Sequence, residues 1–80
     1  MKEMILILAP FECKLCEQVK KLLPSYCRSR GWKLTQIVDE ESEYDIEYYP
    51  HIQIKINDTI VDTIEGFTRP ELFKKLIQYN

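Results

Sequence analysis

The chain has 80 residues, of which 45% are hydrophobic and 30% are charged, a composition typical of globular proteins and not of disordered ones. A chain of this length supports one hydrophobic core, so we predict a single domain over residues 1–80. Eleven basic and thirteen acidic residues leave a formal net charge of −2. This balance argues against nucleic acid as a partner, because phosphate binding needs a concentrated basic surface.

The longest apolar run, residues 4–10, is too short to cross a bilayer and lacks the cleavage site of a signal peptide. We therefore expect a cytoplasmic protein without membrane contact. Its three cysteines are an odd and sparse set, which argues against the disulfide framework of small secreted domains. In a reducing compartment, a close cysteine pair indicates redox catalysis or metal binding.

The first half of the chain predicts a strand, a helix and a second strand. Residues 4–9 are continuously apolar and predict a central strand. Apolar residues recur at helical spacing from Cys13 until Gly31, which predicts a helix that ends at this glycine. Pro24 lies inside that helix and predicts a kink or a break. Residues 32–38 predict the next strand, parallel to the first.

The second half begins with an acidic, tyrosine-rich stretch, residues 39–49, which holds at most a short helix of one or two turns. Residues 51–56 alternate between apolar and polar and predict a strand with one apolar face. An Asn-Asp turn then leads into residues 59–64, the second strand of a hairpin.

A capping box from Thr68 to Glu71 predicts the start of the last helix. This helix is expected to run to about residue 78 and to bury four apolar side chains, Leu72, Phe73, Leu76 and Ile77.

The element order β-α-β-α-β-β-α predicts an α/β fold with a mixed four-stranded sheet and a short middle helix. In the third strand the alternation turns Gln53 and Lys55 away from the core. We therefore expect one face of the sheet to be partly wet, because the middle helix is too short to cover it.

The cysteines of Cys13-Lys14-Leu15-Cys16 follow a strand directly and open a helix. The unpaired N–H groups and the positive dipole end of a helix N-terminus favour the thiolate of Cys13, and Lys14 adds positive charge. A free thiol with a pKa of about 8.5 is little ionised at neutral pH, so this placement favours disulfide exchange. Cys16 lies one turn deeper, within reach of a mixed disulfide on Cys13.

Two other interpretations of the pair stay open, a zinc half-site and an inert pair of core thiols. Zinc needs about four ligands, and the remaining candidates are Cys27 and His51. Cys27 lies roughly 16 Å along the same helix unless the helix breaks at Pro24. We favour the redox interpretation, with no bound metal and no bound cofactor.

Four further features carry weaker hypotheses. Cys27 is most simply a buried packing thiol and otherwise a site of regulatory oxidation. His51 is most simply a solvent-facing residue at a strand start and otherwise a catalytic base. Three tyrosines, Tyr44, Tyr48 and Tyr49, either line a groove for a partner or pack on the sheet, and Tyr49 is the best candidate for partner contact. The acidic run 39–43 is most simply a solvated loop.

The order of these features resembles the thioredoxin superfamily: a strand, CxxC at a helix start, Tyr49-Pro50 before a hairpin, and Gly66 before the last helix. The short N-terminus resembles its glutaredoxin-like branch, and the resemblance covers essentially the whole chain. It implies a thioredoxin fold and a dithiol–disulfide oxidoreductase in which Cys13 attacks and Cys16 resolves. It also implies a cis peptide bond at Pro50, with Tyr49 presenting its backbone to the active site.

The resemblance extends to partners and to the remaining site residues. Disulfide-containing proteins are the implied substrates of a monomeric enzyme, with thioredoxin reductase or glutathione as the reductant. Pro10 stands where many glutaredoxins carry a glutathione-binding lysine, and Lys14-Leu15 replaces their Pro-Tyr. The segment from Gly66 and Phe67 to Leu72 resembles redoxins that reduce ribonucleotide reductase, which is therefore the alternative substrate. A non-catalytic binding or metal module is the alternative outside this class.

Overall fold

The computed structural model describes residues 1–79, whose strands form one sheet. The strands β1 (Lys2–Leu8), β2 (Lys33–Val38), β3 (His51–Ile56) and β4 (Thr59–Ile64) lie in the order β2-β1-β3-β4. Strand β1 runs parallel to β2 and antiparallel to β3, which pairs antiparallel with β4. The predicted mixed four-stranded sheet is confirmed, with β1 as a central strand.

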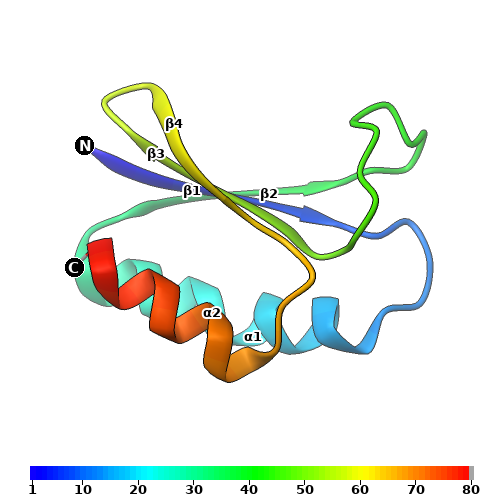
Figure 1. Cartoon of the computed structure of the whole chain (residues 1–80), viewed down its shortest axis with the longest axis horizontal. Helices are drawn as coiled ribbons and strands as arrows, with labels where there is room; N and C mark the ends of the chain where they lie inside the picture. Colours follow the sequence, from blue (N-terminus) through cyan, green and yellow to red (C-terminus); the bar gives the residue numbers. More distant parts are fainter. Residues whose placement is uncertain (80) are drawn as a thin grey trace.

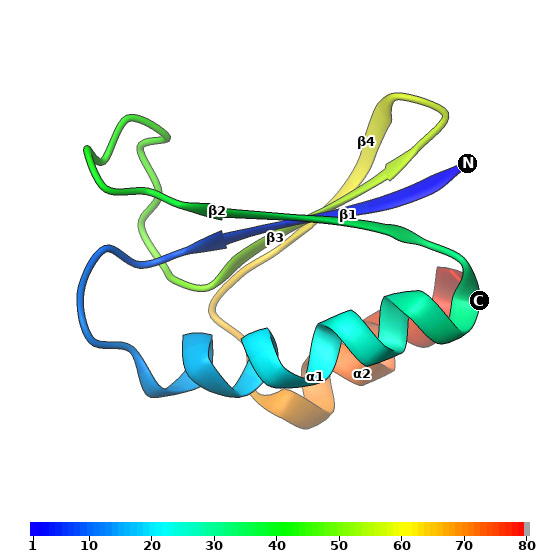
Figure 2. The same ribbon diagram turned by 180° about the vertical axis from the view of Figure 1, so that it is seen from behind.

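Helices α1 (Lys14–Arg30) and α2 (Arg69–Leu76) both lie on the same face of this sheet (Figure 1). The view from behind shows the same two-layer arrangement (Figure 2). The core lies between the layers, and its fully buried side chains come from β1, α1, β3 and α2: Met4, Leu6, Val19, Leu23, Ile52, Ile54, Leu72 and Leu76. No helix within residues 1–79 is long and apolar enough to cross a membrane.

The short middle helix predicted within residues 39–49 is absent, and turns and bends take its place. Ser42 and Asp45 have φ angles of 53° and 51°, in the left-handed region that a right-handed helix cannot include. Repulsion among closely spaced carboxylates also disfavours a helix there. As a result, no helix among the described residues covers the second face of the sheet (Figure 1).

Polar side chains occupy much of this open face. Glu3 on β1 accepts a hydrogen bond from Thr35 Oγ1 at 3.1 Å. Its carboxylate also lies 3.9 Å from the ammonium of Lys55 on β3. Gln53 and Lys55 are half-buried, whereas Ile52 and Ile54, which alternate with them, are fully buried. The prediction of a partly wet sheet face is therefore confirmed.

Helix α1 runs without interruption from Lys14 to Arg30, so the break considered at Pro24 does not occur. Proline removes one backbone hydrogen bond, and the packing of the buried helix face, including Leu23 and Cys27, compensates for that loss. Gly31 ends the helix with a φ of 70°, as predicted, because glycine adopts this left-handed conformation without a steric penalty.

The predicted capping box at the start of α2 is confirmed. The Glu71 N–H donates to Thr68 Oγ1 at 3.4 Å, and the Thr68 N–H donates to Glu71 Oε1 at 3.0 Å. The helix ends at Leu76 and continues as a 3₁₀ turn, η1 (Ile77–Tyr79). Ile77 is 63% exposed, so its predicted burial is wrong, because the tighter turn rotates it off the apolar face.

A truncation in the buried layer tests the two-layer packing. Leu6→Ala removes a fully buried side chain from β1 and should lower the free energy of unfolding by about 3 kcal/mol. Gln36→Ala alters the exposed residue that pairs with Leu6 on β2, and it should change the free energy of unfolding by less than about 0.5 kcal/mol. Urea unfolding measures both, and equal effects would contradict the packing described above.

Candidate active site

Cys13 and Cys16 form a disulfide at the N-terminus of α1, with their Cα atoms 5.2 Å apart. Cys13 is the N-cap residue of the helix, with an extended backbone at φ −149° and ψ 108°. Its Sγ accepts a hydrogen bond from the Cys16 N–H at 3.1 Å. A sulfur thus takes the position that a serine or aspartate oxygen commonly holds at a helix start.

The two sulfurs differ in access and in electrostatic surroundings. Cys13 is half-buried, whereas Cys16 is 4% exposed and belongs to the core. The helix dipole and the N–H of Cys16 both point positive charge at Cys13 Sγ, which favours a thiolate there. Lys14 is exposed beside it, and the exposed carboxylates of Glu12 and Glu17 oppose part of the effect. Cys13 is therefore the sulfur that an outside disulfide can reach.

The loop before β3 lies next to the loop that carries Cys13. The Tyr49–Pro50 peptide bond is cis, in agreement with the resemblance. The Tyr49 ring packs edge-to-face on Phe11, with ring centroids 5.6 Å apart. Phe11 is 59% exposed, so the two rings form a partly exposed aromatic pair near the cysteines. Both Cys13 and Tyr49 pack against the edge of the hydrophobic core.

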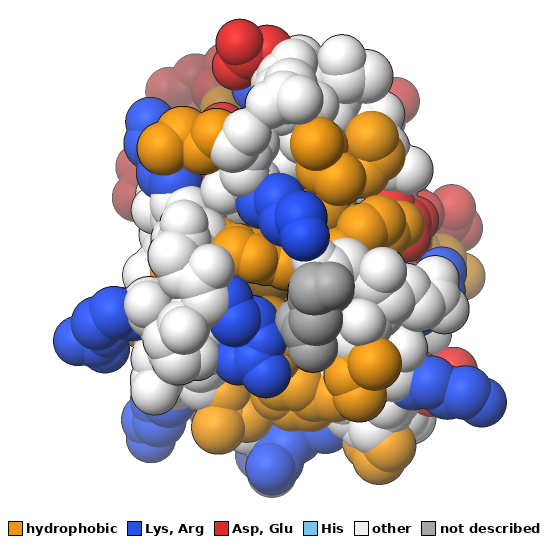
Figure 3. Space-filling model, turned by 90° about the vertical axis from the view of Figure 1, so that its left-hand side faces the viewer, with side chains coloured by type: hydrophobic (Ala, Val, Ile, Leu, Met, Phe, Trp, Pro, Cys, Tyr) orange, Lys and Arg blue, Asp and Glu red, His pale blue; other side chains and the backbone are white. Residues whose placement is uncertain are grey.

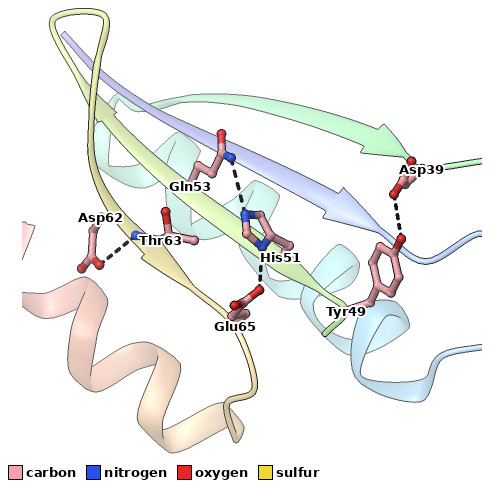
Figure 4. A network of polar contacts seen from close by, with 7 residues as sticks. All are labelled: Asp39, Tyr49, His51, Gln53, Asp62, Thr63 and Glu65. Carbon is pink, nitrogen blue, oxygen red and sulfur yellow. Dashed lines mark hydrogen bonds and ion pairs between the residues drawn. The ribbon is translucent and has the colours of Figure 1, made fainter. Parts of the chain in front are cut away.

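The hydroxyl of Tyr49 donates a hydrogen bond to Asp39 Oδ2 at 2.7 Å (Figure 4). This bond to a carboxylate, with burial and the negative charge of Asp39 as smaller causes, raises the pKa of Tyr49 above its ordinary value. Tyr49 therefore stays neutral, as a hydrogen-bond donor, through the pH range in which thiols react.

The remaining predicted site residues differ in how accessible they are. Pro10 and Lys14 are exposed and Leu15 is half-buried, so these three side chains are available to a partner. Pro50 and Phe67 are buried, and they contribute through the backbone and the core.

Gly66 is exposed and takes a φ of 61°, where a residue with a side chain would be strained. A methyl group at this position would lie 3.9 Å from the Tyr48 ring, which places Gly66 beside the loop before β3.

Two residues near the cysteines went unrecognised in the sequence. Asp39, predicted to lie in a solvated loop, is 1% exposed, so that prediction is wrong for this residue. Its signal was its place directly after the last residue of a strand, where the carboxyl ends of parallel strands meet. Phe11 was not singled out, because a single apolar residue in a loop carries no signal of its own in the sequence.

His51 belongs to a hydrogen-bonded group on the open face of the sheet (Figure 4). Its Nδ1 lies 3.0 Å from Glu65 Oε2, and its Nε2 lies 3.4 Å from Gln53 Nε2. The imidazole is 12% exposed, so the favoured prediction of a solvent-facing histidine is wrong. Since both ring nitrogens already have partners, we assign His51 a structural role.

The end of the molecule opposite the cysteines carries a cluster of lysine and arginine side chains (Figure 3). A hollow of about 770 Å³ lies at this end, and Lys2 and Arg30 are the two cations among its lining residues. Both cations are already engaged, since the Lys2 ammonium donates to the Tyr79 carbonyl and the Arg30 guanidinium carbon lies 3.7 Å from the centroid of the Tyr26 ring. Because the start of β1 and η1 lie at this end of the molecule and the loop of Cys13 lies at the other, the hollow is separate from the candidate site (Figure 1).

Cys27 is 1% exposed and lies against Met4, with its sulfur 3.9 Å from Met4 Sδ. Burial raises its pKa to about 11, although the charge of Arg30 opposes the shift. Its thiol is therefore a packing group, as favoured from the sequence. Within residues 1–79, no cluster of three or more histidine, cysteine or acidic side chains is arranged to hold a metal ion.

Comparison with solved structures shows the fold. The chain is similar to thioredoxin f2 of Chlamydomonas reinhardtii, with a TM-score of 0.79 and 15% identity, over 99% of this chain and 79% of that one. It is also similar to a Plasmodium falciparum thioredoxin, with a TM-score of 0.76 and 18% identity, over 99% and 82% of the two chains. No protein-family model and no curated protein matches the sequence.

These likenesses span almost the whole chain, so it has the α/β thioredoxin fold, as predicted. The CxxC pair of this chain lies in disulfide contact within that fold.

The surroundings of Cys13 and Cys27 predict different reactivity for their thiols. In the reduced, folded protein at neutral pH, iodoacetamide should alkylate Cys13 and leave Cys27 unmodified, because a buried thiol with a raised pKa carries almost no thiolate. Peptide mass spectrometry before and after unfolding in guanidinium measures the difference. Rapid labelling of Cys27 in the folded protein would contradict its assignment as a packing thiol.

The tyrosine hydrogen bonds predict a loss of stability in alkali. Tyr49 and Tyr79 each donate to a carboxylate, which raises both pKa values. The unfolded chain ionises these tyrosines near pH ~10, so the free energy of unfolding should fall as the pH rises above that value. A double variant, Tyr49→Phe with Tyr79→Phe, should show a shallower decline in urea titrations between about pH 9 and about pH 11. Parallel curves would contradict the assignment.

Proposed function

We propose that this chain is a thiol–disulfide oxidoreductase that reduces disulfides in proteins. One observation carries the proposal: an accessible sulfur, Cys13 Sγ, caps the helix and accepts the Cys16 N–H at 3.1 Å, with the second sulfur buried behind it. A nucleophile at a helix N-terminus and a resolving thiol one turn away are the two groups that disulfide exchange requires.

In the first step, the Cys13 thiolate attacks one sulfur of the target disulfide. A bond forms between Cys13 Sγ and that sulfur, the target S–S bond breaks, and the other target sulfur leaves as a thiolate. The positive end of the helix stabilises the attacking anion before the reaction. Because Cys16 is 4% exposed, the target meets Cys13 first.

In the second step, the Cys16 thiol loses its proton to solvent or to the departing thiolate and attacks Cys13 Sγ. The mixed disulfide breaks, the second target sulfur leaves, and the Cys13–Cys16 bond forms, as in the structure. The target has gained two electrons and this chain has lost two. A reductant outside the chain must return them before the next cycle.

The surface around Cys13 supports a protein as the substrate. Phe11 is 59% exposed and packs on the half-buried Tyr49 ring, and exposed aromatic side chains are frequent anchors in protein interfaces. We propose that Phe11 and Tyr49, with Pro10 and Leu15 beside them, contact the polypeptide that carries the target disulfide, and that Lys14 favours an acidic segment.

We propose thioredoxin reductase in preference to glutathione as the reductant, and the cytoplasm as the location. Pro10 lacks the cation that the glutaredoxin resemblance places there, and Lys14 is the one cation within three residues of Cys13. Glu65 keeps 40% of its side chain exposed next to the Gly66 turn, where it would repel the carboxylates of glutathione. Ribonucleotide reductase is the more specific alternative among substrates, and exposed Gly66 beside Tyr48 supports it as a contact point.

Serine variants test the proposed chemistry. Cys13→Ser should lose at least about 100-fold in turnover of insulin disulfides driven by dithiothreitol, because the nucleophile is gone. Cys27→Ser is the matched control and should keep turnover near the wild-type value. Full activity of Cys13→Ser would contradict the proposal, and stoichiometric zinc or iron in elemental analysis of the reduced protein would favour a metal module.

The proposed reductant is tested by turnover in two coupled assays. With NADPH present, thioredoxin reductase should support insulin reduction at a rate equal to or above that with glutathione and glutathione reductase. Lys14→Glu should slow both reactions to a similar degree, because a negative charge beside Cys13 destabilises its thiolate. A change in only one of the two rates would instead indicate an effect on recognition of that reductant. A glutathione rate well above the thioredoxin reductase rate would contradict this choice of reductant.

A further inference from the structure

Asp39 is a buried carboxylate without a complete set of partners. It lies directly after β2 and is 1% exposed. Its Oδ2 accepts the Tyr49 hydroxyl at 2.7 Å, whereas its Oδ1 has no hydrogen-bond partner within residues 1–79. A buried carboxylate oxygen without a partner destabilises a fold, so its presence calls for an explanation other than stability.

The backbone of Asp39 fixes this carboxylate near the loop that carries Cys13. The Asp39 N–H donates to the Leu8 carbonyl at 3.0 Å, which extends the pairing of β1 and β2 by one bond. Leu8 is the last residue of β1, and the chain then runs through residues 9–12 to Cys13. Asp39 therefore stands at the sheet end from which the cysteine loop departs.

Tyr49 extends the connection to the other loop beside the cysteines. Its hydroxyl is held by Asp39, its backbone precedes the buried Pro50, and its ring packs on Phe11 with centroids 5.6 Å apart. Phe11 in turn lies within the cysteine loop, two residues before Cys13. One carboxylate is thus linked, through a single tyrosine, to both loops that a protein substrate would meet.

We infer that Asp39 is a positioning residue, which holds Tyr49 and Phe11 in the arrangement that receives a protein disulfide at Cys13. The inference rests on the proposed function and deepens it, because it assigns recognition of the protein substrate to a buried group. A small disulfide does not need the aromatic pair, so Asp39 affects KM for protein substrates more than the reactivity of the thiol itself.

The chain contains a matched pair for comparison. Tyr79 donates to Asp62 Oδ2 at 2.7 Å, the same distance as in the Tyr49–Asp39 pair. Both tyrosines have raised pKa values for the same causes. Tyr79 lies in η1, near the C-terminus and at the end of the molecule away from the loop of Cys13 (Figures 1 and 2). Loss of the Tyr79–Asp62 pair therefore removes an equivalent hydrogen bond and leaves the proposed substrate-contact surface beside Cys13 unchanged.

The test measures kcat and KM for insulin, with dithiothreitol as reductant, and the rate of the reduced protein with the small disulfide hydroxyethyl disulfide. Asp39→Ala and Tyr49→Phe remove the bond from either side and should each raise KM for insulin about threefold to tenfold, the equivalent of one hydrogen bond. Both should leave kcat and the small-disulfide rate within about twofold. Asp39→Asn keeps a hydrogen-bond acceptor for the Tyr49 hydroxyl, so its KM for insulin should lie close to the wild-type value.

The control variants, Tyr79→Phe and Asp62→Ala, should keep the wild-type KM. An unchanged KM in Tyr49→Phe, an equal loss in Tyr79→Phe, or an equal loss with the small disulfide would overturn the inference while the proposed function stands. A wild-type protein that reduces neither insulin nor the small disulfide would overturn the proposed function, and the inference with it. Circular dichroism checks that each variant is folded. If Asp39→Ala does not fold, the KM of Tyr49→Phe alone decides the test.

Discussion

The hydrogen bond from the Cys16 N–H to Cys13 Sγ is the interaction on which the site depends. It starts α1 at the proposed nucleophile, so the helix dipole and the unpaired N–H groups of the first turn act on the same sulfur. The position of that helix is set by its buried face, where Val19, Leu23 and Cys27 pack against the sheet. Packing along the whole of α1 thus holds one sulfur at an accessible edge and the other in the core.

A second feature follows from the absence of the middle helix. Residues 39–50 cross from β2 to β3 as a series of turns, and both helices stay on the same face of the sheet. The open face is covered by polar contacts, among them Glu3 with Lys55 and His51 with Glu65. The loop does not add a layer to the fold, and it brings Asp39 and Tyr49 together beside the cysteine loop. The part of the chain that departs most from the predicted fold therefore supplies the proposed recognition surface.

Much of the fold could be predicted from local patterns. The strands and helices follow from apolar periodicity, and the capping box at Thr68 and the stop at Gly31 follow from backbone chemistry that a few residues determine. The middle helix could not be excluded in this way, because left-handed conformations at Ser42 and Asp45 are not specified by composition.

The cysteine pair was recognisable for the same reason, since its spacing and its place after a strand are local. Burial of Asp39 and partial burial of His51 depend on which loops fold back over the sheet, and this is a tertiary property. Exposure of Ile77 likewise depends on where the last helix tightens into a 3₁₀ turn. Local sequence therefore identified the cysteine pair, whereas the contacts that position its surroundings required the structure.

The most direct test of the account is to trap the covalent intermediate. The Cys16→Ser variant, reduced and then mixed with a protein disulfide, lacks the resolving thiol and should accumulate a mixed disulfide. Peptide mass spectrometry under non-reducing conditions should locate the link at Cys13, and dithiothreitol should release it. A link at Cys27, or no adduct at all, would contradict the assignment of Cys13 as the nucleophile.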